Sequence, residues 1–149
     1  MATLTFEVFS RFQSATDANR LLYTPIEAKL TYNHTRLYTV ECEGDVEAAR
    51  DYMRRVLVDP IAQKVEEDGK PALSGELFCI SYGIKKGALD LEKEAILTNY
   101  RGRQGLPFTI TALTITQKVY VFGEGNKTAL AERFCKDVCN PAIHTWSVR

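Results

Sequence analysis

Residues 35–65 read TRLYTVECEGDVEAARDYMRRVLVDPIAQKV. They indicate the fold, because a second stretch of the chain has the same predicted order of elements. The second stretch, residues 116–148, is TQKVYVFGEGNKTALAERFCKDVCNPAIHTWSV, and the two align without gaps at an offset of 81 positions. At this offset Glu43-Gly44 aligns with Glu124-Gly125. Asp59-Pro60 aligns with Asn140-Pro141 near the end. Both stretches are typical of a strand, a glycine turn, an amphipathic helix and a short strand. The sequence therefore indicates an internal duplication.

The helix in each stretch is predicted from apolar residues that recur at helical spacing. Asp45 and Asn126 each follow a glycine and suit the N-cap position. Asp59 and Asn140 each precede a proline, which disfavours the helical conformation and ends the helix. The apolar positions are Val46, Ala49, Met53 and Val56 in the first helix, and Leu130, Phe134 and Val138 in the second.

The region before each stretch extends the repeat. Alternating apolar residues predict a strand over residues 4–12, with a counterpart over residues 77–84. Helical stretches are expected next over residues 17–30, where Pro25 interrupts or ends the helix, and over residues 89–102. Each copy is thus expected to run strand, helix, strand, strand, helix, strand.

This order predicts an α+β protein made of two tandem β-α-β-β-α-β units. The units are expected to span residues 1–68 and 76–149, with a linker at residues 69–75. Because one such unit leaves a sheet face bare, the two antiparallel sheets are expected to pack face to face, with helices outside.

Composition excludes several classes of protein. Hydrophobic residues make up 45% and charged residues 26% of the 149 residues, and the net charge is zero. These values are unlike those of a disordered chain, a membrane bundle or a nucleic-acid binder. The start lacks the pattern of a signal peptide, so a cytoplasmic protein is expected. The halves differ in charge, because residues 1–74 carry 9 basic and 12 acidic side chains and residues 75–149 carry 10 and 7.

The cysteines are interpreted as reduced structural thiols. Cys135 and Cys139 lie four residues apart on the expected second helix and line its apolar face with Phe134. A zinc site needs about four ligands, and no CxxC or HxxxH pattern accompanies them, so no metal site is predicted. The other two cysteines are Cys42 and Cys79.

No catalytic or cofactor-binding residue is predicted. The sequence has no GxSxG, no P-loop and no GxGxxG after a strand. His34 and His144 have no nucleophile at a recognisable spacing. Arg101 and Arg103, in the glycine-containing stretch at residues 100–105, are weak candidates for phosphate contact and fit a solvated loop better.

Several motifs resemble the PurS family, the small subunit of phosphoribosylformylglycinamidine synthase. They are CNPAIHTW at residues 139–146, ISYGIKKGALDLEKEAI at residues 80–96 and, more weakly, VDPIAQKV at residues 58–65. The first copy departs from the pattern at residues 12–18, which lack the Lys-x-Gly of the turn. Over nearly the whole chain, the sequence is similar to the duplicated PurS-like region at the N-terminus of some long synthetases.

The resemblance implies a non-catalytic assembly role. PurS-like units hold a glutaminase subunit (PurQ-like) against an ATP-dependent synthetase subunit (PurL-like), so that ammonia passes between them in purine biosynthesis. The resemblance also implies self-association through the sheets. No cofactor, nucleic acid or membrane partner is expected, since the charge shows no basic excess and the chain has no long apolar run. The alternatives are a tandem ACT-type module that binds a small amino acid near Gly83 or Gly87, and an enzyme of unknown type.

The final strand supplies the interface candidates. It is expected over residues 143–148, with an equivalent over residues 62–66. A last strand that lies at a sheet edge can pair its backbone groups with a strand of another chain or of the other copy. Trp146 is the only tryptophan and either anchors an interface or packs in the core of its unit. The candidate interface residues are Asn140, Pro141, Ile143 and Trp146.

Overall fold

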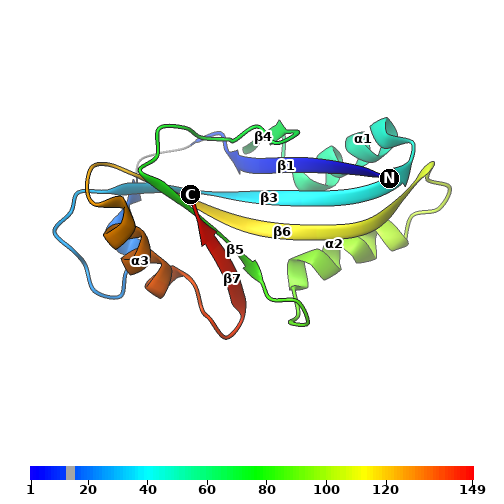
Figure 1. Cartoon of the computed structure of the whole chain (residues 1–149). Coiled ribbons are helices and arrows are strands. Elements are labelled where there is room, and N and C mark those ends of the chain that lie inside the picture. The colour runs from blue at the N-terminus through cyan, green and yellow to red at the C-terminus, as the bar shows by residue number, and fades with distance from the viewer. Residues whose placement is uncertain (13–15) are drawn as a thin grey trace.

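The computed structural model describes residues 1–12 and 16–149 and shows an α+β fold with a single seven-stranded sheet (Figure 1). Three α-helices and one short 3-10 helix accompany the sheet in the described residues. The elements in chain order are β1 (Ala2–Ser10), β2 (Thr16–Asp17), η1 (Ala18–Leu21), β3 (Thr31–Gly44), α1 (Val46–Leu57), β4 (Gln63–Glu67), β5 (Phe78–Ile84), α2 (Leu91–Arg101), β6 (Phe108–Phe122), α3 (Lys127–Val138) and β7 (His144–Val148).

The strands lie in the order β4-β1-β3-β6-β5-β7, with β2 paired to β3, and all of these pairs are antiparallel. The order β4-β1-β3, taken from one edge inward, matches β7-β5-β6 taken from the other edge. The short strands β4 and β7 form the two edges of the sheet. In the centre, β3 and β6 pair along almost their whole lengths, with one β-bulge near Cys42.

The expected face-to-face packing of two sheets is wrong. The two halves of the chain join edge to edge through β3 and β6, which have 14 and 15 residues. These strands are long because each runs unbroken where two successive strands were expected. Their pairing satisfies backbone groups that two separate sheets would each leave at a free edge.

The helices confirm most of the local predictions. α1 and α3 each have twelve residues and begin 81 positions apart. The side chains of Asp45 and Asn126 accept hydrogen bonds from the third amide beyond them, at 3.1 Å in both helices. Asp90 caps α2 in the same way, and Gly102 follows its last residue.

The helix expected over residues 17–30 is reduced to the four residues of η1. Pro25 cannot donate a backbone hydrogen bond and restricts the residue before it. Asn19 fixes the segment instead, because its side chain accepts from the Ile26 amide at 3.0 Å and donates to the Ile26 carbonyl at 3.2 Å. The turn expected at residues 12–18 lies partly outside the described residues.

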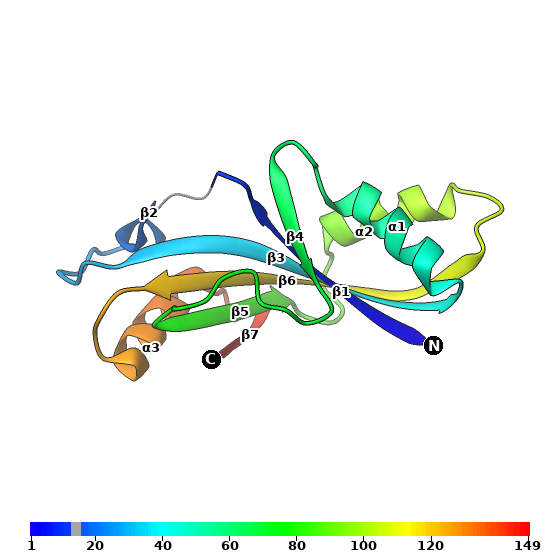
Figure 2. The same cartoon turned by 90° about the horizontal axis from the view of Figure 1, so that it is seen from above.

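Two apolar cores are shared between the halves of the chain. The first lies under α1 and includes residues of β1, β3 and β6, and α2 from the second half packs against it through Ile96, Leu97 and Tyr100. The second lies under α3, and the first half contributes Ala18 of η1 and Leu22, the residue after η1, to it. Figure 2 shows α1 and α2 together at one end of the sheet and α3 at the other end. Each core therefore depends on residues from both halves.

The connection from β4 to β5 includes the expected linker, residues 69–75. β4 covers Gln63–Glu67, so it begins and ends one residue later than the strand expected over residues 62–66. Figure 1 shows the connection passing above the strands at the end where α3 lies below them. α3 and this connection therefore cover opposite faces of the same end of the sheet.

Candidate functional site

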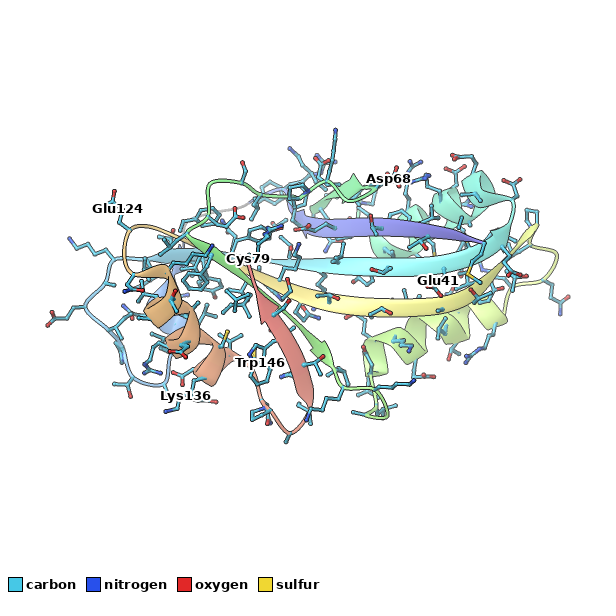
Figure 3. All side chains as sticks on the ribbon, in the orientation of Figure 1. Glu41, Asp68, Cys79, Glu124, Lys136 and Trp146 are labelled. Carbon is cyan, nitrogen blue, oxygen red and sulfur yellow. The ribbon has the colours of Figure 1, made fainter. Side chains whose placement is uncertain are left out.

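The edge strand β7 exposes large apolar side chains. In and just before this strand, Ile143, Trp146 and Val148 are 42%, 41% and 43% exposed. A tryptophan of the core would be almost fully covered, so the position of Trp146 favours the interface role over the core role. Figure 3 shows Trp146 on the side of β7 that faces α3.

Trp146 and Val148 line an open groove between α3 and β7, with a volume of about 660 Å³. The α3 residues Ala131 and Cys135, together with Cys139 just beyond the helix, give the groove an apolar wall. This volume lies in the usual range for a ligand or peptide side-chain site. The remaining lining residues are Lys127, Thr128, Glu132, Lys136, Pro141 and Arg149.

The groove is held by contacts at its two sides. Phe134 of α3 packs on Phe78 of β5, with ring centroids 5.8 Å apart, and this fixes the helix on the sheet. Asn140 orders the turn into β7. Its side-chain oxygen accepts from the backbone amide of Ala142 at 2.9 Å. Its backbone amide donates to Nδ1 of His144 at 2.9 Å. The structure thus brings the interface candidates Asn140, Pro141, Ile143 and Trp146 to one end of the groove and its turn.

Basic side chains dominate the rim of the groove. Lys127, Lys136 and Arg149 oppose the single carboxylate of Glu132. Arg149 also pairs with Glu76 at 3.2 Å, whereas no ion pair of the described residues involves Lys127 or Lys136. The groove therefore presents apolar walls with an excess of positive charge.

The two cysteines in the groove are neutral thiols. The pKa of Cys139 is raised to about 12, mainly because the thiol is buried and secondly because Cys135 lies beside it. Burial also raises the pKa of Cys135. A raised pKa lowers the thiolate fraction, so these side chains act as apolar wall residues rather than nucleophiles.

The equivalent space between α1 and β4 is closed by ion pairs. Arg50 and Arg54 of α1 bind the two carboxylate oxygens of Glu67 in β4, at 2.9 Å and 2.8 Å. Burial by itself would raise the pKa of Glu67, but the hydrogen bonds from Arg54 and Arg50 outweigh it and lower that pKa. At the offset of 81 positions, the corresponding residues of the second half are Ala131, Cys135 and Val148.

The sequence analysis did not predict this difference between the halves. The aligned repeats contain the difference. Arg50, Arg54 and Glu67 of the first half align with Ala131, Cys135 and Val148 of the second half. The positions at which the halves differ in charge locate the open groove.

The sequence reasoning also missed a buried polar cluster on the sheet face away from the helices. The Glu7 carboxylate is 3% exposed, accepts from Thr35 Oγ1 at 2.8 Å and lies 3.6 Å from Nζ of Lys118. The hydroxyl of Tyr120, a fully buried residue, also donates to this carboxylate. The pKa of Tyr120 is raised, mainly because the hydroxyl is buried and secondly because it makes this hydrogen bond. The cluster joins β1, β3 and β6 across the centre of the sheet and therefore has a structural role.

Other predicted positions lie away from the groove. Arg101 and Arg103 are exposed at the C-terminal end of α2, where the helix dipole is negative and does not favour phosphate. His34 lies inside β3. Gly83 lies inside β5, and Gly87 lies in the turn to α2 with a φ of 92°.

Comparisons with known proteins give no relative to guide the assignment, since no family model, curated protein or solved structure matches this chain. Among the described residues, no group of three His, Cys, Asp or Glu side chains is arranged to hold a metal ion. In the same part of the chain, every helix is too short or too polar to cross a membrane.

Proposed function

We propose that the chain is a non-catalytic assembly subunit or domain of a glutamine-dependent phosphoribosylformylglycinamidine synthase. In this role it holds the glutaminase subunit against the synthetase subunit so that ammonia passes directly between them. The proposal rests on the resemblance of residues 80–96 and 139–146 to the PurS family.

We also propose that residues 1–68 and 76–149 are duplicated units joined by residues 69–75. The strand order, which matches when taken inward from either edge, supports this proposal. The lengths and spacing of α1 and α3 support it too, as does the equal spacing of β4 and β7, which both have five residues and begin 81 positions apart. A tandem pair would place within one chain what two copies of a single unit form by association.

The observation that carries the assembly role is the exposed apolar edge at β7. Apolar side chains gathered beside a groove with a basic rim are typical of a surface that another protein covers. At the second sheet edge, the ion pairs of Glu67 fill the space between β4 and α1, so the two edges are suited to different roles.

The experiment is a reconstitution of the synthase with and without this chain. We expect glutamine-dependent turnover to require the chain, because ammonia must be delivered between two active sites. Turnover with free ammonia should proceed without it. Equal glutamine-dependent turnover in its absence would contradict the proposed function.

A thermal-shift screen with free amino acids tests the ACT-type alternative. The assembly role predicts no specific stabilisation by any amino acid. A saturable increase in melting temperature with one amino acid, together with no effect of the chain on glutamine-dependent turnover, would favour the alternative.

A further inference from the structure

The outer backbone groups of β7 are directed away from the sheet. Cys79 of β5 and Arg149 exchange both backbone hydrogen bonds, at 3.2 Å and 3.0 Å. Antiparallel pairs alternate along a ladder, so the N–H and C=O groups of Trp146 and Val148 point to the side opposite β5. In the part of the chain that the structure describes, no strand lies beyond β7.

The same two residues aim their side chains at α3. Trp146 and Val148 both line the groove. These two residues, spaced two apart, therefore present both free backbone groups and apolar side chains. An added strand would continue the sheet at the usual spacing of about 4.8 Å from β7. Every second side chain of that strand would then enter the groove beside α3.

The rim adds a charge preference. Lys127 at the start of α3 and Lys136 near its end are exposed and bind no carboxylate of the described residues. An extended segment lying along the groove would pass near the positive ends of both side chains. Carboxylates at its flanks would be favoured by these charges.

We propose that a segment of the synthetase subunit adds to β7 as an extra strand. Its apolar residues, spaced two apart, fill the groove against Trp146, and its acidic flanks meet Lys127 and Lys136. This inference rests on the proposed function and specifies how the partner binds. The position corresponding to Val148 on the other edge is Glu67, whose ion pairs with Arg50 and Arg54 fill the space that such a strand's side chains would need.

A proline substitution tests the backbone contact. Val148→Pro and Val148→Ala both remove the valine side chain, but only proline removes the outward N–H, and proline is tolerated at such edge positions. We expect Val148→Pro to weaken binding of the purified synthetase subunit about five-fold relative to Val148→Ala. The matched control is Val65→Pro on β4, which should leave the affinity unchanged. Equal affinity of Val148→Pro and Val148→Ala would overturn the strand addition.

Charge reversal provides a second variant that leaves the strand intact. We expect Lys127→Glu with Lys136→Glu to weaken binding at least ten-fold at low salt, and less at high salt. Lys85→Glu with Lys86→Glu, in the exposed turn before α2, is the control and should have no such effect. An equal loss in both double variants would contradict a contact at the groove.

The only tryptophan of the chain reports the location. The chain labelled with 5-fluorotryptophan should show a shifted fluorine resonance for Trp146 when the unlabelled synthetase subunit binds. Binding without a change at Trp146 would overturn this inference and leave the proposed function standing. If the wild-type chain does not bind the synthetase subunit at all, both fall.

Discussion

Replacing Tyr120 by phenylalanine removes one hydroxyl from the centre of the sheet. That hydroxyl donates to Glu7, whose carboxylate is 3% exposed and, among the described residues, keeps Thr35 and Lys118 as partners after the change. A hydrogen bond to a buried charged group contributes about 1.5–3 kcal/mol. For a chain of this length, a loss of about 2 kcal/mol lowers the melting temperature by roughly 4–8 °C.

Thermal and urea unfolding of the wild type and Tyr120→Phe measure this loss. The control is Tyr23→Phe, which removes the same atom from a side chain that is 86% exposed and should change stability by less than about 0.5 kcal/mol. Equal stability of Tyr120→Phe and the control would show that the Glu7 carboxylate does not depend on this hydroxyl.

Three further predictions follow from the shared cores, the Glu67 ion pairs and the exposed edge. Fragments 1–68 and 76–149 should each lack a cooperative melt alone and regain it when mixed, because each core contains residues of both halves; independent folding of either fragment, seen by circular dichroism, would be inconsistent with this. The lowered pKa of Glu67 means that its ion pairs stabilise the fold above the unfolded carboxyl pKa of about 4.3, and that this contribution disappears as the pH falls through the lower folded-state value. Wild type and Glu67→Gln should therefore differ in melting temperature near neutral pH and converge in acid, and a difference that grows in acid would reverse the sign of the argument. Trp146→Ala should cost less than about 1.5 kcal/mol by urea unfolding, since the side chain is 41% exposed, whereas a loss of about 3–5 kcal/mol would restore the core role.

Local patterns in the sequence predicted local structure well. The N-caps at Asp45 and Asn126 and a helix within the expected residues 89–102 depend on nearby residues, and the structure confirms them. Pro25 was recognised as a helix breaker, but its effect was underestimated, because Asn19 offers the backbone a different set of hydrogen bonds.

The arrangement of the halves could not be predicted in the same way. Two units can pair face to face, which covers their bare sheet faces, or edge to edge, which pairs their free backbone groups. The sequence pattern does not distinguish these two arrangements. The long pairing of β3 with β6 selects the edge. The same limit applied to Glu7, whose place in the alternation of β1 indicates a solvent-facing residue, although hydrogen bonds from β3 and β6 bury it.

Residue-resolved amide exchange of the chain, alone and with the synthetase subunit, tests the central claim that β7 is the docking edge. The amides of Trp146 and Val148 should exchange quickly in the free chain and become strongly protected in the complex. The amides of Val65 and Glu67, at the equivalent places on β4, should not change. Protection elsewhere on the surface, with Trp146 and Val148 still exchanging freely, would contradict the account.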